Sequence, residues 1–294
     1  YQAGPNSAWV SDHNENGRID AGDLLNDPRW ADGRDNDKNG FFDDLFGVNF
    51  RSGPDDPLPR NHPYDEVGHG THVAGTIGAI GGNDFRGVGV NWQTSIMSLR
   101  ILDGNNQSDT GAGLAAINYA RMMLERLTMN QQERTTAGAN VRVLNNSWGQ
   151  TGGYERALDQ AIERLDDAGI LFVAASGNGN IFGQGVDNDD TPFYPASYPS
   201  DSVIAVGAST PDGQIASFSN FGRESVDLFA PGVGIRSTLR DGGFGTANGT
   251  SMAAPHVTGT AALIWSALPS ASAGEVRDAI LSTVDGIEGD TLPS

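Results

Sequence analysis

The chain of 294 residues contains no cysteine, which excludes both disulfide bonds and thiolate chemistry. Lysine is nearly absent as well, because Lys38 is its single occurrence and the other basic residues are arginines. No run of about 18 apolar residues is present, so the sequence predicts no membrane-spanning helix. There is no signal peptide and the first residue is Tyr1, so we expect the chain to be a processed piece of a longer protein.

Positive charge is in short supply. The 18 basic residues are outnumbered by 37 acidic ones, which gives a formal net charge of −19. Nucleic-acid binding depends on neutralising phosphates with Lys and Arg, so we expect no nucleic-acid partner. The acidic excess suits cation binding, high solubility or a salty environment.

From about residue 67 onward, apolar runs alternate with helical segments. The runs lack polar alternation, which is typical of parallel strands buried on both faces. The predicted strands lie at Ile96–Leu102, Val141–Leu144, Ile170–Ala175, Val203–Val206 and Val226–Phe229. Apolar stripes predict helices over 114–127 and 158–165, and a third helix from Ser251 toward Leu268. The alternation predicts an α/β fold with a mostly parallel central sheet flanked by helices.

Residues 1–66 have a different composition. Asp, Asn and Gly are frequent there, and periodic apolar patterning is nearly absent. We expect this part to form an acidic loop region within one domain, while residues 67–294 form the main body. No composition shift indicates a second globular domain.

The segment 248–260 reads NGTSMAAPHVTGT and predicts a helix that begins near Ser251. A serine at a helix N-terminus lies beside unpaired N–H groups and the positive end of the dipole, which favour a developing oxyanion. Pro255 is tolerated because it falls in or near the first turn. The alternative is that Ser251 only caps the helix.

Two more segments combine polar groups with close-packing glycines. Residues 68–75 read GHGTHVAG, in which His69 lies between two glycines and His72 follows one helical turn later. The two histidines also have the spacing of a metal pair, but no third ligand stands out nearby. Asn178 follows the strand-like run 170–175 in the sequence SGNG, where an ordinary turn is the alternative.

These segments together resemble the histidine, asparagine and serine motifs of the subtilisin-like serine protease family. The resemblance implies that His69 is the general base, Ser251 the nucleophile and Asn178 the oxyanion donor, with His72 and His256 structural. The sequence around Ser147, Trp148 and Gly149 is similar to the family's N-x-S-x-G segment, which pairs with the substrate backbone. Residues 106–108 are a weaker candidate for the opposite wall. The resemblance further implies a subtilisin-like fold, secretion and cleavage of peptide or protein substrates.

The family's aspartate, which orients the histidine, has no convincing match before His69. Asp20 follows Glu15–Arg18 and Ile19, and these residues lack the apolar character that a buried strand requires. We therefore expect the aspartate to lie upstream of Tyr1, on a segment that stays bound as a separate chain. A chain without it would lose about 10⁴-fold in turnover.

Residues 12–23, DHNENGRIDAGD, match a calcium-binding EF-hand loop with glycine at its sixth position. The predicted ligands are Asp12, Asn14, Asn16, the Arg18 carbonyl, Asp20 and Asp23. A solvated polar loop is the alternative. We expect Ca²⁺ to neutralise these carboxylates and order a segment that has little core of its own.

A second segment, DNDKNGFFDDLF at residues 35–46, repeats the pattern except at its last position, where Phe46 replaces the acid. The predicted ligands are Asp35, Asp37, Asn39, the Phe41 carbonyl and Asp43, with Asp44 as a substitute for the missing acid. Certain calcium-dependent members of the subtilisin-like family resemble this insert.

Two other functions compete with the protease. The lack of an aspartate motif would suit a peptide-binding pseudoprotease without turnover. Residues 12–46 alone would suit a calcium-binding interaction module.

Overall fold

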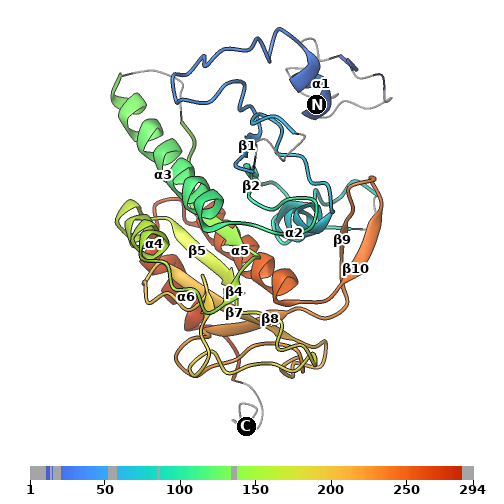
Figure 1. Ribbon diagram of the computed structural model, residues 1–294, viewed down its shortest axis with the longest axis vertical. Coiled ribbons are helices and arrows are strands. Elements are labelled where there is room, and N and C mark those ends of the chain that lie inside the picture. Colours follow the sequence, from blue (N-terminus) through green and yellow to red (C-terminus); the bar gives the residue numbers. More distant parts are fainter. Residues whose placement is uncertain are drawn as a thin grey trace.

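The computed structural model describes residues 11–13, 15, 21–51, 58–84, 87–133 and 138–286. Its centre is a four-stranded parallel sheet in the order β3-β5-β7-β8 (Figure 1). The strands are β3 (Val143–Asn146), β5 (Leu171–Ala175), β7 (Val203–Ser209) and β8 (Leu228–Pro231). Each coincides with or overlaps a predicted strand, and the predicted α/β class is confirmed.

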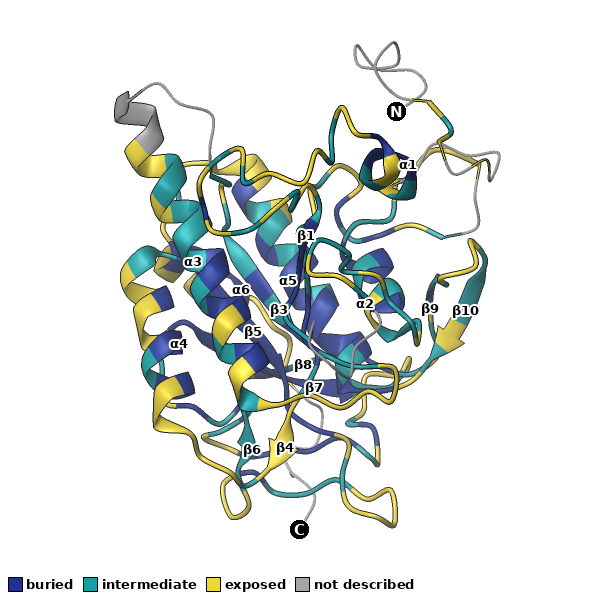
Figure 2. Ribbon diagram, turned by 45° about the horizontal axis from the view of Figure 1, so that its top comes forward, coloured by how far each residue is buried: buried dark blue, intermediate teal, exposed yellow. Residues whose placement is uncertain are grey.

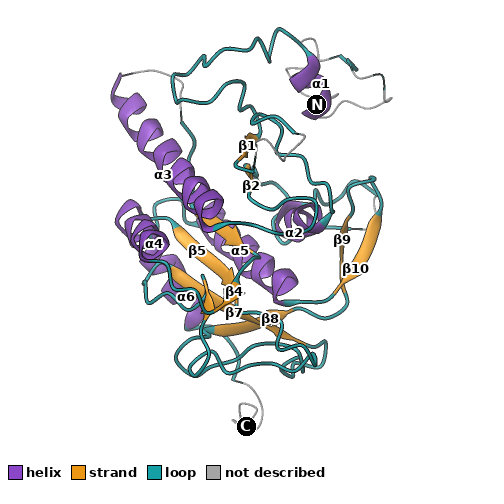
Figure 3. Ribbon diagram, in the orientation of Figure 1, coloured by secondary structure: helices purple, strands orange, loops and turns teal. Residues whose placement is uncertain are grey.

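Helices cover both faces of this sheet (Figure 3). On one face, Phe172 and Ala174 of β5 pack in one buried cluster with α3 (Thr110–Glu133) and α4 (Arg156–Ala168). On the other, Leu171 and Val173 pack with α5 (Thr250–Ala267) and α6 (Ala273–Leu281). Alternate residues of a strand point to opposite faces, so a strand covered on both sides must be apolar throughout, as β5 is.

Burial follows the same arrangement. All five residues of β5 are buried, and Figure 2 shows β7 largely in the dark blue of buried residues. Helix α4 has Ile162 and Leu165 fully buried on its inner side. It ends at Gly169, whose φ of 71° is the left-handed conformation that glycine adopts most readily at a helix C-terminus. Among the described residues, no helix is long and apolar enough to cross a membrane.

Three two-stranded sheets and two short helices surround this centre. The parallel pair is β1 (Gly47–Asn49) with β2 (Ser98–Arg100). The antiparallel pairs are β4 (Gln150–Thr151) with β6 (Phe193–Tyr194), and β9 (Ile235–Thr238) with β10 (Phe244–Ala247). The remaining helices are α1 (Ala21–Asn26) and α2 (His69–Gly78).

The structure differs from the sequence-based expectation in the first third of the chain. The predicted strand at Ile96–Leu102 is the short β2, which pairs with β1 rather than with the central sheet. Strand β1 lies within the acidic region and is buried, with Val48 only 1% exposed. Residues 1–66 therefore contribute one strand to the body of the molecule; the division at residue 66 stays a prediction.

A cavity of about 870 Å³ separates β2 from β3. Leu99 and Ile101 line it from the β2 side, and Val141 and Val143 line it from the β3 side. Helices α2, α3 and α5 also contribute to its walls. Among the described elements, β2 pairs only with β1 and β3 only with β5, so each strand has one unpaired edge.

Candidate active site

Ser251 is the second residue of α5, at the carboxyl-terminal edge of the parallel sheet. Its Oγ donates a hydrogen bond to the backbone carbonyl of Ser147, 3.3 Å away. In return, the Ser147 Oγ donates to the Ser251 carbonyl over 2.8 Å. That carbonyl has no helical N–H partner four residues on, because Pro255 has no N–H. The proline, which lies just beyond the first turn, thus leaves the Ser251 carbonyl free to hold Ser147.

Asn178 lies beside the start of α5, at the end of the chain segment that leaves β5. Its Oδ1 accepts from the Thr250 N–H at 2.8 Å and from the Thr250 hydroxyl at 3.0 Å. A backbone N–H can only donate, so this contact fixes which end of the amide is oxygen. The Nδ2 group is therefore the outward end of an exposed side chain. Thr250 is itself held, because its hydroxyl accepts from the Gly177 N–H.

His69 is the first residue of α2. Val73, one turn further along that helix, packs in a buried cluster with Met252, which is next to Ser251 in the sequence. The described residues contain no hydrogen bond between His69 and Ser251, although catalytic contacts are often long before substrate binds. Burial lowers the pKa of His69; the charge of Asp65 acts to raise it and His72 to lower it. The lowered pKa favours the neutral imidazole that a general base needs at pH 7.

Asp65 was not singled out from the sequence. Its Oδ1 accepts the N–H groups of Val67 and Gly68, and its Oδ2 accepts the N–H and the hydroxyl of Thr71. Burial acts to raise the pKa of Asp65, but these donors outweigh it and hold the pKa below the usual value. The carboxylate thus organises the start of α2, where the capping position is Gly68 and offers no side chain. The run from Asp65 to His69 could have revealed this role, because an acid just before a helix is a common N-terminal signal.

His72 is buried, and both of its ring nitrogens lack a hydrogen-bond partner within the structure. Its backbone carbonyl accepts from the Ser237 hydroxyl at 2.7 Å, which ties α2 to β9. The third histidine of the motifs, His256, has its Nδ1 2.8 Å from the Met252 carbonyl, within α5. These contacts agree with structural roles for His72 and His256, which stay predictions.

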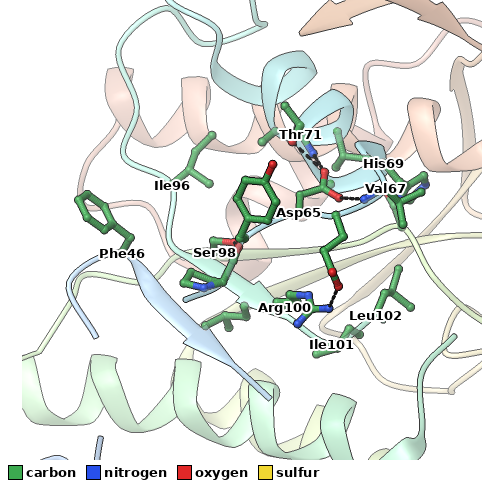
Figure 4. Close-up of a pocket in the computed structure, with 18 of the residues that line it drawn as sticks. Phe46, Asp65, Val67, His69, Thr71, Ile96, Ser98, Arg100, Ile101 and Leu102 are labelled. Carbon is green, nitrogen blue, oxygen red and sulfur yellow. Dashed lines mark hydrogen bonds and ion pairs between the residues drawn. The ribbon is translucent and has the colours of Figure 1, made fainter. Parts of the chain in front are cut away.

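A second cavity, of about 670 Å³, lies beside His69 (Figure 4). Asp65 and His69 line it together with Leu102, Asn106 and Trp148. Arg100 and Glu66 form an ion pair of 2.6 Å at the same cavity, with Arg100 nearly buried. This cavity adjoins the one between β2 and β3, because Val73, Ala74 and Leu99 line both.

The predicted substrate-binding residues Ser147, Trp148 and Gly149 leave the end of β3 and lead into β4. The Trp148 indole donates to the Asn146 side chain at 3.1 Å. Ser147 lies against Ser251, and Gly149 is exposed. Among the opposite-wall candidates, Asn106 has a φ of 58° in an exposed turn beside the 670 Å³ cavity.

The first predicted calcium loop lies mostly outside the described residues. Asn14, Asn16, Arg18 and Asp20 belong to the part that is not described. Asp12 and Asp23 are described. Asp23 is completely buried, and its carboxylate accepts the His13 N–H at 2.8 Å.

The second predicted loop is a turn closed by its own acids. The Asp35 carboxylate accepts the N–H groups of Asn39, at 2.9 Å, and Gly40, at 2.8 Å. Gly40 has a φ of 91°, in agreement with the glycine that EF-hand loops require at their sixth position. Asn39 accepts in turn from the N–H of Phe41.

The acids at the end of this loop point to different partners. Asp43 accepts the Gly33 N–H through Oδ2, while its buried Oδ1 has no hydrogen-bond partner. Asp44 accepts from Asn39 and from the Tyr119 hydroxyl. Burial, followed by the charge of Asp44, raises the pKa of Asp37. Within the described ranges, no group of three or more His, Cys, Asp or Glu side chains is arranged to hold a metal ion.

Comparisons with known proteins find similarity to the subtilases. A profile described as the Subtilase family, Peptidase_S8, matches residues 19–293. Subtilisin amylosacchariticus of Bacillus subtilis subsp. amylosacchariticus is 38% identical over 237 residues, which are 80% of this chain and 56% of that protein. Subtilisin DY of Bacillus licheniformis is 37% identical over 246 residues, 84% of this chain and 78% of that protein.

Among solved structures, a cold-adapted subtilisin-like serine proteinase matches with a TM-score of 0.66 and 32% identity. The match covers 83% of this chain and 76% of that one. The chain spans about half the length of the first of the curated relatives, 56% of it. The family profile covers nearly the whole chain, and the fold matches that of a subtilisin-like proteinase, so the chain belongs to the subtilase family.

Proposed function

We propose that the protein is a secreted serine endopeptidase that hydrolyses peptide bonds through an acyl-enzyme on Ser251. The observation that carries the proposal is the orientation of Asn178. Its oxygen is bound to Thr250, next to the nucleophile, so its Nδ2 is free to donate to an oxyanion formed at Ser251. The similarity to subtilisins of Bacillus supports the activity.

The reaction follows from these contacts. The Ser251 hydroxyl leaves the long 3.3 Å contact with the Ser147 carbonyl and transfers its proton to neutral His69 as Oγ attacks the peptide carbon. Negative charge then develops on the carbonyl oxygen, where Asn178 Nδ2 and the N-terminal N–H groups of α5 stabilise it. Protonated His69 gives the proton to the leaving amine. Water, deprotonated by His69, hydrolyses the acyl-enzyme in the same way.

In this proposal, the carboxylate that orients His69 comes from a segment upstream of Tyr1. Asp65 is poorly suited to the task, because both of its oxygens are occupied by the start of α2. The 870 Å³ cavity between β2 and β3 supports an added strand, because apolar side chains of both segments line it and two unpaired strand edges flank it. Such a strand would continue toward the adjoining cavity beside His69.

We propose that residues 1–66 are an acidic insert in the same catalytic domain.

A calcium role for the acidic loops belongs to the proposal as well. In the second loop, the buried Asp43 Oδ1 has no hydrogen-bond partner, and burial together with the charge of Asp44 raises the pKa of Asp37 even though Arg126 lies 4.0 Å away. Asp35, Asp37, Asn39, the Phe41 carbonyl and Asp43, with Asp44 nearby, would hold the ion. The first loop would use Asp12, Asn14, Asn16, the Arg18 carbonyl, Asp20 and Asp23. Bound Ca²⁺ would supply positive charge that stabilises the folded loops.

A peptide-binding pseudoprotease is the second candidate function. It is favoured by the lack, within the described residues, of both a His69–Ser251 hydrogen bond and a carboxylate bonded to His69. Covalent labelling of Ser251 distinguishes the pseudoprotease from the active protease.

The first prediction concerns the reactivity of Ser251. We expect a fluorophosphonate to label the native protein at Ser251, and His69→Ala to abolish this labelling, because the hydroxyl is a poor nucleophile without its base. The control for loss of a serine hydroxyl is Ser217→Ala. Ser147→Ala would not serve, because Ser147 is hydrogen-bonded to Ser251. Peptide mass spectrometry locates the label. A native protein that binds peptide but takes up no label would favour the pseudoprotease.

The second prediction concerns the source of the orienting carboxylate. Native mass spectrometry of the purified protein should detect an additional polypeptide bound to this chain, with an aspartate at the end of an apolar run. Denaturation should separate the two. A fully active preparation that contains this chain alone would contradict the proposal.

The third prediction concerns the acidic limb of the kcat/KM profile, which follows deprotonation of His69. Asp65→Asn removes the negative charge that raises the pKa of His69, so the limb should move to lower pH. Asp212→Asn is the matched control, because Asp212 is exposed in a turn and does not act on His69. A limb that moves upward, or moves equally in both variants, would argue against His69 as the titrating base.

The fourth prediction concerns calcium. An excess of chelator should lower the melting temperature, since a ligand present at about 100 times its Kd stabilises the folded state by about 2.7 kcal/mol. Asp37→Asn should reduce the dependence of the melting temperature on Ca²⁺, whereas Asp241→Asn, in an exposed turn, should leave it unchanged. Melting that is unchanged in excess chelator would refute the calcium role.

A further inference from the structure

A narrow gap opens at the carboxyl ends of β3 and β5. The two strands pair as far as Asn146 and Ala174, and beyond this point β3 turns away through Ser147–Gly149 toward β4. The other strand continues beside β7, where the Ser176 N–H donates to the Val206 carbonyl, and then reaches Asn178. The diverging segments have glycines facing the gap, Gly149 on one side and Gly177 on the other.

The ring of Phe193 fills the space between these glycines. A Cβ placed on Gly149 would lie 2.3 Å from Phe193 Cε1, and one placed on Gly177 would lie 3.0 Å from Phe193 Cδ2. These two carbons are on opposite edges of the same ring. The ring therefore spans the gap from one wall to the other.

Phe193 is held firmly in this position. It lies in β6, where it is paired with Thr151 of β4. Its N–H donates to the Ser197 hydroxyl at 3.1 Å, and its carbonyl accepts the Ser197 N–H at 2.9 Å. Its side chain packs against the cluster that holds α3 and α4 to the sheet. A ring with these restraints cannot swing aside without disturbing that cluster.

The gap is also where the reaction would place a substrate side chain. The scissile carbonyl must lie between Ser251 Oγ and Asn178 Nδ2, and the acyl residue attached to it lies beside Ser147, which is bonded to Ser251. The side chain of that residue, the one just before the scissile bond, has Ser147–Gly149 on one side and Ser176–Asn178 on the other. Phe193 forms the floor between them.

We propose that Phe193 restricts the residue before the scissile bond to a small side chain: glycine, alanine or serine. A longer side chain would collide with the Phe193 ring, which lies between Gly149 and Gly177 and packs against the cluster that holds α3 and α4 to the sheet. The buried Asn220 closes the region further, because its amide lies beside Gly177 and donates to Asn188 at 2.9 Å. This inference rests on the proposed endopeptidase function and names its substrate class.

The test compares peptides that differ only in the residue before the scissile bond, alanine, leucine or phenylalanine, with the full-length enzyme that includes the orienting aspartate. We expect kcat/KM of the unmodified enzyme to be at least about tenfold higher for alanine than for leucine or phenylalanine. Phe193→Ala should reverse this order and raise kcat/KM for the larger residues by about 10- to 200-fold.

Two further variants make the result interpretable. Phe193→Leu keeps most of the apolar volume of the side chain and should weaken the preference for alanine only in part. It therefore tests the role of Phe193 even where Phe193→Ala fails to fold. Phe182→Ala is the matched control, because Phe182 follows Asn178 closely in sequence but is 79% exposed on an outer turn. It should leave the preference unchanged.

The outcomes separate this inference from the function on which it rests. An active, fluorophosphonate-labelled enzyme that already prefers leucine or phenylalanine, or whose preference is the same in the Phe193 variants, would overturn the role of Phe193 alone. Absence of both hydrolysis and labelling would overturn the proposed function, and the preference with it.

Discussion

The reciprocal pair of hydrogen bonds between Ser147 and Ser251 joins the two halves of the candidate site. One half is the N-terminus of α5, and the other is the chain that leaves β3. The pair exists because Pro255 provides no N–H for the Ser251 carbonyl, which accepts the Ser147 hydroxyl instead. A residue unfavourable inside a helix thus fixes Ser251 against the segment proposed to bind substrate.

The sheet supplies the positions that this contact connects. Both faces of β5 are covered, by α3 and α4 on one side and α5 and α6 on the other, so the strand cannot shift register without exposing apolar side chains. The carboxyl end of β5 therefore holds Asn178 in a fixed position beside Thr250. The same constraint sets the gap between Gly149 and Gly177, because that gap is the divergence of two strands whose earlier residues are held in register.

The sequence allowed the local features of the site to be predicted, because they depend on neighbours in the chain. The uninterrupted apolar runs located the central strands, and the motifs around His69, Asn178 and Ser251 indicated the family. The helix α6 could have been predicted too, since Ser272 and Glu275 form a capping box that is visible as a Ser-x-x-Glu pattern. Features that depend on distant segments could not. The pairing of β2 with β1, and the contact of Phe193 with residues 149 and 177, require the tertiary fold.

Binding and turnover depend on different parts of this structure. The groups that would hold substrate and its oxyanion, Ser147, Asn178 and the start of α5, are fixed by contacts among themselves. The orientation of His69 has no comparable support in the described residues, where its nearby carboxylate is committed to the start of α2. Removing an orienting aspartate costs about 10⁴ in turnover while the oxyanion donors retain their effect. A segment that completes the sheet between β2 and β3 would therefore change the rate of the chemical step far more than the affinity for peptide.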